Sequence, residues 1–552
     1  MRFFDEEGDP APVVCFLRRR RFFVERWSPP TELSKQEQLI MKRLNRVRAL
    51  FGFLRTKRHI IFDDEFQQQL EGMYRDSGAG EEPHPPAMMC MALLLQGYVG
   101  ASDAEAVEMA VMDLRWQMVL DCLGTTEPPF SQGALQAFRQ RLVEHEMDRA
   151  LLERTVALVR DGVAKKGEAQ ALSKALRVAI DSRPLVGAGK VEDTINLLGH
   201  AARSIIRIVS KILGVSEEDI CRKARARLFL GSSIKAALDI DWSDAKQKAT
   251  AIEIVERQVS SLQNWVERSL DCYENEPLRP FLEAIDVVRE QDLERAPGGG
   301  VAIRQGVAPD RRISIEDREM RHGRKSRSKR FNGYKEHIAR DLDVPAVVAC
   351  AITPANRPEE EGAGPIGEDI SRQGFTIAEA HIDRAYVNSA LMLETMASGG
   401  AVVAKPWPQR ARRPGMFSKA DFAIDLRTRT ITCPAGQVEP FEPGETVHFD
   451  PEACGGCSLR TSCTEAAIGR GRSVSIAEDE GTQRRFRKLQ STRTGRAKLR
   501  ERVAVEHSLA RIAARKGHRA RYVGTRKNLF DLRRAAAIQN LEAVHQMERL
   551  AA

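Results

Sequence analysis

The sequence predicts a multidomain protein of the α plus α/β class, in which an all-helical N-terminal domain precedes a mixed β-sheet domain. Three observations lead to this prediction. A chain of 552 residues, 42% of them hydrophobic, is long enough for several domains with their own cores. The first 170 residues carry apolar side chains at helical spacing, whereas short apolar runs that stop at carboxylates follow in 171–189 and 310–412. We expect a helical insertion at 190–309 and a small cysteine-rich insertion at 413–480 to interrupt the sheet domain.

The overall charge favours an anionic partner. The chain has 86 Lys and Arg against 77 Asp and Glu, which gives a net charge of +9. No stretch approaches the roughly 18 uninterrupted apolar residues of a membrane span, so no membrane partner is expected. The first residues mix acids, Pro and Arg and do not form a secretory signal. Most cysteines are scattered singly, as reduced thiols are, and we expect a cytoplasmic protein.

The N-terminal region divides into two parts. Residues 1–35 predict a poorly ordered basic arm that contains Arg18–Arg21. Residues 36–170 predict a helical domain, with a Met- and Leu-rich buried helix after position 86. Ser102 is a candidate helix N-cap, and Ser131 is another.

The sheet domain is predicted from runs that end at acids. The apolar run Leu176–Ile180 stops at Asp181, which would place this carboxylate at the carboxyl edge of a sheet. Residues 333–354 predict two strands, a helix follows near 362–373, and the strand Thr376–Ile382 stops at Asp383. A short helix near 388–398 and a strand at 401–405 complete this part. An ordinary strand-end aspartate is the alternative interpretation of either acid alone.

A basic run precedes the two strands. Residues 321–330 contain six cations and no acid, as expected of a loop that contacts phosphates. A solvated turn is the alternative. The candidate DNA contacts in this run are Arg324, Lys325, Arg327, Lys329 and Arg330.

Four cysteines cluster in 413–480. They have the spacing C-x20-C-x2-C-x5-C, and Pro434 and Gly436 follow the first of them. This pattern predicts one structural Zn²⁺ in a small ribbon or knuckle, because four thiolates close a tetrahedral site. Four reduced thiols without a metal are the alternative. The candidate ligands are Cys433, Cys454, Cys457 and Cys463.

The C-terminal region, 481–552, contains a basic stretch around one acid. Residues 495–528 predict a long helix whose apolar side includes Leu499, Val503 and Leu509. Residues 484–527 hold sixteen Lys and Arg but only two acids, one of which is Glu506. A lone acid in such a field suggests a metal ligand near a polyanion, whereas an i,i+4 pair with Arg502 on a solvated helix is the alternative.

Asp181, Asp383 and Glu506 together form a candidate metal site. Hard divalent cations take oxygen ligands, and two of them about 4 Å apart catalyse phosphodiester chemistry. We therefore expect two Mg²⁺ or Mn²⁺ ions. The three acids are separated by 202 and 123 residues, so no local motif joins them.

The order of these elements resembles that of a known protein family. The segments that carry the resemblance are PHPPAMM with LLLQGY, LQAFRQRL, VAIDSRPLVGAGKVEDTINLLG, GRKSRSKRFNGYKEHIARDLD, HIDRAYVNS, CPAG with CGGCSLRTSCT, and RVAVEHSLARIAARKGHRARYVGTRKN. With them the chain resembles DDE-class insertion-sequence transposases. The resemblance covers roughly residues 60–190 and 310–545. It implies that the helical domain of 36–170 binds DNA. It also implies an RNase H-like catalytic core in 171–189 and 310–412, with Asp181, Asp383 and Glu506 as catalytic metal ligands.

The resemblance also suggests further residues. Related transposases carry a Tyr-x2-Arg-x3-Glu-x6-Lys pattern, in which Arg502 and Glu506 match here. The Tyr position is Leu499 and the Lys position is Ala513, a departure that leaves the role of the Lys open, with Lys516 or Arg515 one turn later as substitutes. Arg502, one turn before Glu506, is a candidate for a phosphate contact, and Lys516, Arg519 and Arg521 are further candidates for DNA contacts. Tyr386, three residues after Asp383, is a secondary candidate for the site.

The function implied by the resemblance is divalent-metal-dependent cleavage at transposon ends and strand transfer into target DNA. The partners would be transposon-end and target duplexes, and the protein would assemble as a homodimer or larger on DNA, associated with a bacterial nucleoid when active. The alternatives are an RNase H-like nuclease without strand transfer, a catalytically decayed DNA-binding protein, and a zinc-ribbon scaffold for protein partners.

Overall fold

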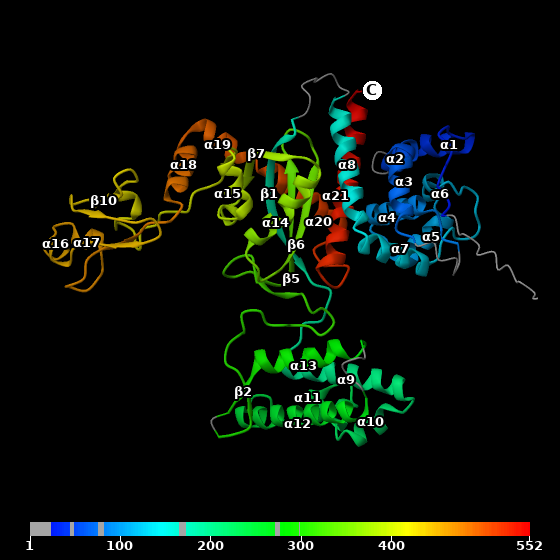
Figure 1. Ribbon diagram of the computed structural model, residues 1–552, viewed down its shortest axis with the longest axis horizontal. Helices are drawn as coiled ribbons and strands as arrows, with labels where there is room; N and C mark the ends of the chain where they lie inside the picture. Colours follow the sequence, from blue (N-terminus) through cyan, green and yellow to red (C-terminus); the bar gives the residue numbers. More distant parts are fainter. Residues whose placement is uncertain are drawn as a thin grey trace, which may run out of the picture. The chain divides into compact units, whose positions relative to one another are not determined.

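The computed structural model describes residues 24–44, 49–74, 82–164, 173–270, 276–296 and 298–551. The chain divides into two compact units, one formed by Met1–Lys166 with Arg533–Ala552 and the other by Gly167–Leu532 (Figure 1). The first unit is helical in its described part and the second contains a mixed sheet, so the α plus α/β layout is confirmed. Most of the predicted basic arm, up to residue 23, lies outside the described residues. Among the described helices, none combines the length and apolar character needed to cross a bilayer.

The first unit is a set of helices around a Met- and Leu-rich core. Helix α4 is buried along nearly its whole length, as predicted. Ser102 forms a capping box with Glu105, and Ser131 accepts the Ala134 N–H at 3.1 Å, so both predicted caps are confirmed. The helices are α1 (Lys35–Arg43), α2 (Ala49–Ile61), α3 (Asp64–Glu71), α4 (Pro86–Val99), α5 (Asp103–Met112), α6 (Leu114–Leu120), α7 (Gln132–Glu144), α8 (Met147–Ala164) and the end of α21 (Thr525–Ala551).

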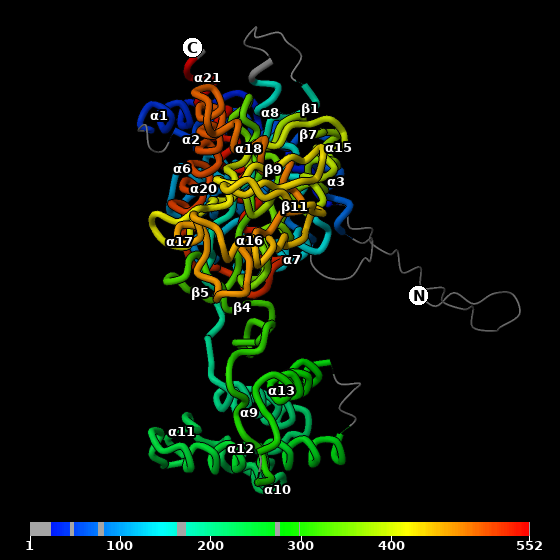
Figure 2. Tube along the Cα trace, turned by 90° about the vertical axis from the view of Figure 1, so that its left-hand side faces the viewer, coloured from blue at the N-terminus to red at the C-terminus, as the bar shows by residue number. Residues whose placement is uncertain are grey.

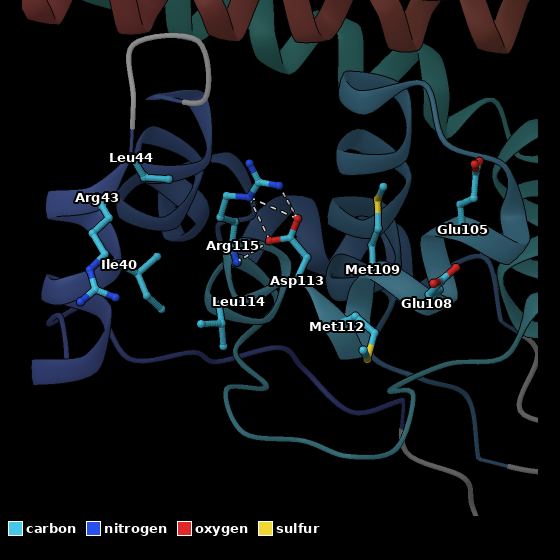
Figure 3. A pocket seen from close by; sticks show the side chains of 10 residues that line it. All are labelled: Ile40, Arg43, Leu44, Glu105, Glu108, Met109, Met112, Asp113, Leu114 and Arg115. Atoms are coloured by element: carbon cyan, nitrogen blue, oxygen red, sulfur yellow. Dashed lines mark hydrogen bonds and ion pairs between the residues drawn. The ribbon is translucent and has the colours of Figure 1, made fainter.

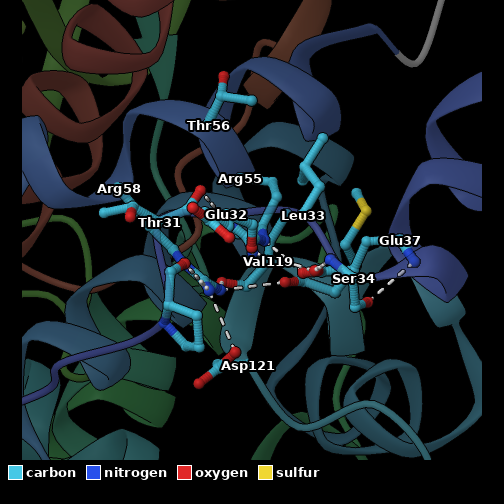
Figure 4. Close-up of polar contacts among 12 residues, drawn as sticks. Thr31, Glu32, Leu33, Ser34, Glu37, Arg55, Thr56, Arg58, Val119 and Asp121 are labelled. Atoms are coloured by element: carbon cyan, nitrogen blue, oxygen red, sulfur yellow. Dashed lines mark hydrogen bonds and ion pairs between the residues drawn. The ribbon is translucent and has the colours of Figure 1, made fainter.

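Two buried arginines tie the first helices of this unit together. Arg55 pairs with Glu37, so α2 is joined to α1 (Figure 4). Arg58 donates to the carbonyls of Met118 and Val119 at 3.1 and 3.0 Å, so α2 is also joined to α6. Burial lowers the pKa of Arg58 to about 10, which leaves it charged at neutral pH. Each buried guanidinium therefore has an acidic partner within the unit, although Arg58 Nε itself has no hydrogen-bond partner. An unpaired buried charge would be strongly destabilising.

The second unit is built on a six-stranded mixed sheet. The strand order is β4-β5-β1-β7-β8, and β6 also pairs with β5. β1 is antiparallel to β5 and parallel to β7, which is in turn parallel to β8. The strands are β1 (Ala175–Val186), β4 (Arg321–Arg324), β5 (Arg330–Asp341), β6 (Val347–Pro354), β7 (Thr376–Ile382) and β8 (Ala401–Val403).

Most predicted elements of the sheet are present, and one is longer. Strand β7 begins and ends where the sequence predicts. The prediction that the first strand stops at Asp181 is wrong, because β1 continues to Val186. Antiparallel pairing with β5 extends that far, from Val178 opposite Asp341 to Val186 opposite Gly333. Helix α14 (Ala363–Arg372) packs on β6, and α15 (Ala390–Ala397) packs by β7 and β8.

The long helix predicted for 495–528 is broken in two places. Helix α19 (Arg493–Arg500) ends before a turn at 501–502, and α20 (Val503–Lys516) ends at Gly517, whose φ of 81° favours glycine. Helix α21 begins at Thr525. The buried side of α20, which packs against β1 and β5, includes Val505 and Leu509, whereas Val503 is exposed.

The helical insertion predicted at 190–309 contains a helical block with its own hydrophobic cluster (Figure 2). Ile205, Val255 and Ile285 from three of its helices are fully buried in that cluster. The elements are α9 (Thr194–Leu213), α10 (Glu217–Lys223), η2 (Arg227–Phe229), α11 (Ile234–Leu238), α12 (Ala245–Ser269), α13 (Arg279–Asp292), β2 (Leu293–Arg295) and β3 (Val301–Ile303).

The cysteine-rich region also has its own small core. Phe422, Ile431 and Phe449 are buried there, and three of the four cysteines pack against this cluster. The elements are η5 (Lys419–Asp421), β9 (Ala423–Asp425), β10 (Thr430–Thr432), β11 (Val438–Pro440), β12 (Thr446–His448), α16 (Pro451–Gly455), α17 (Arg460–Cys463) and β13 (Ser473–Ser475), followed by α18 (Glu480–Ser491).

Candidate active site

Two neighbouring strands bring Asp181 and Asp383 to the same level of the sheet. β1 and β7 are parallel with Ile180 opposite Ile382, so the aspartate that follows each of these residues lies in the next register position. The Asp181 side chain is 15% exposed and that of Asp383 is 45% exposed. Asp383 accepts the Arg384 N–H at 2.7 Å and so begins the short 3₁₀ helix η4 (Arg384–Tyr386). The Asp181 side chain is thus largely buried, whereas that of Asp383 is open to solvent.

Helix α20 adds Glu506 through an arginine. Because α20 packs against β1, its first turn lies near Asp181. Arg502 donates from one guanidinium nitrogen to Asp181 Oδ2 at 2.6 Å and from the other to Glu506 Oε1 at 2.7 Å. The predicted helical pair between Arg502 and Glu506 is therefore present, and it extends to a third residue on the sheet. We call Asp181, Asp383, Glu506 and Arg502 the Asp181 cluster.

The Asp181 cluster is crowded with negative charge. Burial raises the pKa of Asp181, and Glu506 and Glu359 raise it further, although Arg502 lowers it. Carboxylate oxygens are the donors that hard divalent cations prefer. A cation placed among these acids would relieve their mutual repulsion, so the donor set fits Mg²⁺ or Mn²⁺.

A neutral polar pair lies behind these acids. The Tyr386 hydroxyl is 2.6 Å from Nδ1 of His337, whose Nε2 is 2.9 Å from Thr353 Oγ1. Burial lowers the pKa of His337 to about 3, so this ring is uncharged at neutral pH. Burial also raises the pKa of Tyr386 well above its usual value, and nearby acids add to that shift. The back of the site therefore adds hydrogen bonds without adding charge.

A second group of possible ligands was missed by the sequence analysis. Glu379, His381 and Glu501 offer ligand atoms within 4.8 Å of one another, and they form the one such group of three found among the described residues. The spacing Glu379-x-His381-x-Asp383 could have revealed it, because alternate residues of a strand share a face. We call Glu379, His381 and Glu501, with the cations that contact them, the Glu379 cluster.

Cations already occupy the Glu379 cluster. Arg177 lies 3.1 Å from Glu379, pairs with Glu501, and contacts Asp343 at 2.9 Å. Lys498 also pairs with Glu379. Burial opposes ionisation of Glu379, but the bonds from Lys498 and His381 lower its pKa overall. This arrangement joins β1 and β7 to the turn at 501–502, which immediately precedes the helix that carries Glu506.

The basic hairpin predicted to contact DNA is exposed. Strands β4 and β5 form it, and the Lys325 N–H bonds the Lys329 carbonyl at 2.9 Å in the turn. All five predicted cations of this hairpin are exposed: Arg324, Lys325, Arg327, Lys329 and Arg330. They are thus available to a large anionic partner.

The other predicted cations differ in exposure. Arg519 and Arg521 are exposed next to a short segment that pairs with the end of β1, where the Ala520 N–H bonds the Val186 carbonyl at 2.7 Å. Lys516 is instead buried, and its ammonium pairs with Glu336 and, at 3.1 Å, with Asp531. Burial opposes the charge on Lys516, but these two acids raise its pKa overall. The ammonium is engaged inside the protein and is not presented to a duplex.

The four predicted zinc ligands lie in one module as half-buried free thiols. Backbone N–H groups approach three of the sulfurs: that of Gln437 lies 3.3 Å from Cys433, that of Leu459 lies 3.4 Å from Cys457, and that of Arg472 lies 3.5 Å from Cys454. Burial raises the pKa of Cys463, and the three other cysteines raise it further. The other three cysteines thus lie near Cys463, although no three of the four sulfurs lie within 4.8 Å of one another.

The first unit contains a cavity with its own set of lining residues. The cavity has a volume of about 670 Å³ and lies between α1, α5 and α6 (Figure 3). Met112 and Leu114 line it and are more than half exposed, and Arg115 pairs with Asp113 beside them. None of the predicted site residues lines this cavity.

Comparison with known protein families gives two matches. Residues 432–545 match the family described as "Transposase DDE domain", and this segment contains the four cysteines and Glu506. Residues 41–141 match "Transposase domain (DUF772)", which covers much of the N-terminal helices. Neither the comparison with curated proteins nor that with solved structures found a match. The resemblance noted in the sequence is confirmed by the two family matches.

Proposed function

We propose that this chain, which its two family matches identify as a DDE-class insertion-sequence transposase, cuts DNA at the ends of its element and joins the freed strand to target DNA. The observation that carries the proposal is the bridge of Arg502 between Asp181 and Glu506, next to Asp383. It gathers, from two strands and a helix, the acids that the resemblance assigns to catalysis.

Asp181, Asp383 and Glu506 would hold two divalent cations. Bound there, such ions activate the attacking oxygen and stabilise the leaving oxygen of an in-line displacement. The carboxylates orient this centre, and the uncharged pair of His337 and Tyr386 supports it from behind. In the first step water attacks the phosphodiester at the element's end and a 3′-hydroxyl leaves. In the second step that hydroxyl attacks a target phosphodiester, so that a new phosphodiester joins the two DNAs and the 3′-hydroxyl of the cut target strand leaves. Water and DNA supply both nucleophiles, so no protein nucleophile is needed.

The exposed cations would hold the DNA. The β4–β5 hairpin, together with Arg519 and Arg521, presents positive charge on the unit that contains the Asp181 cluster. Phosphate contacts of this kind give binding that weakens as salt is raised. The helices of 36–170 would supply contacts to base edges, and the protein would act as a homodimer or larger assembly on its DNA.

The cysteine module would hold one structural Zn²⁺. Four sulfurs leave no open coordination position, so the metal would stabilise the module and take no part in the reaction. Cys457→Ser is expected to lose the zinc and lower the melting temperature, while the matched Cys122→Ser, outside the module, keeps the zinc. Metal analysis of purified protein measures this. Zinc-free wild-type protein that melts as a single folded species would contradict the proposal.

The main test is cleavage of a labelled duplex that carries the DNA flanking the gene, with Mg²⁺, with Mn²⁺ and with EDTA. We expect metal-dependent nicking and joined products, which Asp383→Asn abolishes and the exposed control Glu394→Gln leaves intact. Nicking without joined products would favour the nuclease alternative. Binding without cleavage would favour a decayed DNA-binding protein, and a lack of salt-sensitive DNA binding would favour the scaffold.

A further inference from the structure

The segment that follows β6 lies close to the turn after Asp383. Both β1 and β6 are antiparallel to β5, so they run in the same direction. β6 ends at Pro354, which pairs with Tyr334 and so lies level with Leu185 of β1, beyond Asp181 in the same direction. The chain continues into the 3₁₀ helix η3 (Glu359–Gly362), which packs against η4, the turn that Asp383 begins.

The end of η3 lies directly on the neutral pair behind the site. A Cβ atom added at Gly362 would come within 2.5 Å of His337 Nδ1, the atom that bonds the Tyr386 hydroxyl at 2.6 Å. A 3₁₀ helix rises about 2 Å per residue, which places Glu359 roughly 6 Å along the axis from Gly362. Glu359 is thus on the same short element that packs against η4, the turn that follows Asp383.

The electrostatic surroundings agree with this placement. After burial, Glu359 is the largest influence that raises the pKa of Tyr386, ahead of Asp181 and Asp383. Glu359 also contributes to the raised pKa of Asp181. In the part of the chain that the structure describes, the half-buried Glu359 forms no ion pair within 4.0 Å. Its charge therefore acts on the same small volume as those of the other acids.

From the approach of η3 to η4 and Tyr386, we propose that Glu359 is a fourth carboxylate of the catalytic centre and a ligand of one of its two divalent cations. This inference rests on the proposed function. Asp181, Asp383, Glu506 and Glu359 carry four negative charges, which balance two divalent cations without the Arg502 guanidinium. Mg²⁺ prefers six oxygen ligands, and a fourth carboxylate replaces a water in one of the two coordination shells.

A purely structural role for Glu359 predicts something different. Lys335 is half-buried, and Glu359 with Glu361 offsets the burial that lowers the pKa of Lys335. If balancing Lys335 is its only role, then removing the Glu359 charge changes stability but leaves the affinity for metal ions unchanged.

The test compares Glu359→Gln with Glu360→Gln, the exposed neighbour on the same turn, in the full-length protein. The readouts are Mn²⁺ binding without DNA, followed by electron paramagnetic resonance, and the Mg²⁺ concentration that gives half-maximal cleavage. We expect Glu359→Gln to weaken the binding of one Mn²⁺ by about tenfold or more and to raise the Mg²⁺ requirement, with partial recovery of cleavage at high Mg²⁺. Glu360→Gln is expected to behave as wild type.

Wild-type Mn²⁺ affinity and Mg²⁺ dependence in Glu359→Gln would overturn the inference, and if Asp383→Asn still abolished cleavage the proposed function would stand. Wild-type protein that binds no Mn²⁺ and cleaves nothing would overturn both. If Glu359→Gln does not fold, Glu359→Asp keeps the charge on a shorter side chain. A reduced Mn²⁺ affinity in that variant, at an unchanged melting temperature, would support a ligand, and an unchanged affinity would oppose it.

Discussion

The Asp181 cluster and the Glu379 cluster lie on the same face of the sheet but differ in how their charge is neutralised. Arg177 and Asp181 are four residues apart on β1, as Glu379 and Asp383 are on β7, which corresponds to about 13 Å along the strands. In the Glu379 cluster two cations satisfy the acids. In the Asp181 cluster a single arginine is shared by two acids, and the third is 45% exposed.

The difference shows that closely spaced ligand atoms do not by themselves identify a metal site. The Glu379 cluster has the more compact set of possible ligands, but a metal ion would have to displace both Arg177 and Lys498. The Asp181 cluster would have to release only Arg502. We interpret the Glu379 cluster as a clamp, a set of ion pairs that holds the turn at 501–502. We interpret the Asp181 cluster as the site that this clamp positions.

The largest expected difference between the two clusters is in catalysis. It can be tested at Glu506 and Glu501, which lie five residues apart in the sequence. Glu506→Gln is expected to lower the cleavage rate by about 10³-fold or more, about 4 kcal/mol of barrier, because it removes a metal ligand. Glu501→Gln is expected to keep the rate within about tenfold, because Arg177 retains Glu379 and Asp343 as partners. Cleavage rates and thermal unfolding of both variants measure this. Equal losses of cleavage rate in the two variants would contradict the proposed difference between the clusters.

The next difference is in stability. Arg177→Met removes the cation that joins β1 to β7 and to the turn at 501–502. Because hydrogen bonds to charged groups contribute about 1.5–3 kcal/mol and Arg177 is 36% exposed, we expect a loss of about 1–3 kcal/mol in the free energy of unfolding. Urea unfolding measures it, with the exposed Arg500→Met as the matched control. A loss no greater than that of the control would mean that the clamp contributes little.

The sequence predicted those features of the two clusters that depend on the local pattern of residues. Strand β7 and its terminal Asp383 follow from a short apolar run that stops at an acid. The extent of β1 beyond Asp181 depends on pairing with β5, which is distant in the sequence. The burial of Lys516 likewise depends on Glu336, 180 residues away. Such placements require tertiary contacts that no local spacing reveals.

The break at 501–502 was missed for a related reason. Its residues are helix formers, and the charged pattern continues across it. The turn is held by ion pairs from Glu501 to the sheet, which the local sequence does not show. The RNase H-like core, the domain boundaries and the metal ligands stay predictions.

The next effect, which is smaller for each pH unit, concerns the dependence of stability on pH. The pKa of His337 is about 3 in the folded protein, below the unfolded value near 6.5, so the unfolded chain binds a proton more readily between these values. This contribution to stability is complete above about pH 6.5 and is lost as the pH falls toward 3, by at most about 1.4 kcal/mol per pH unit. His337→Gln is expected to flatten that slope in urea unfolding at several pH values. The control Glu394→Gln keeps the slope, and an unchanged slope in His337→Gln would mean that the back of the Asp181 cluster is not neutral.

The smallest expected effect tests whether Arg502 holds the place of a metal ion. Since the guanidinium occupies Asp181 and Glu506, a divalent cation must displace it to bind both acids. A charge about 4 Å away at a partly exposed site amounts to roughly 1 kcal/mol after solvent screening, or about fivefold in affinity. Arg502→Gln should therefore bind Mn²⁺ about fivefold more tightly in the absence of DNA, as measured by calorimetry, and yet cleave DNA more slowly because a phosphate contact is lost.

The control is removal of an arginine from the Glu379 cluster. Arg177→Met should not create comparable Mn²⁺ binding, because Lys498 still pairs with Glu379. Weaker Mn²⁺ binding in Arg502→Gln would show that the arginine organises the acids for the metal and does not compete with it.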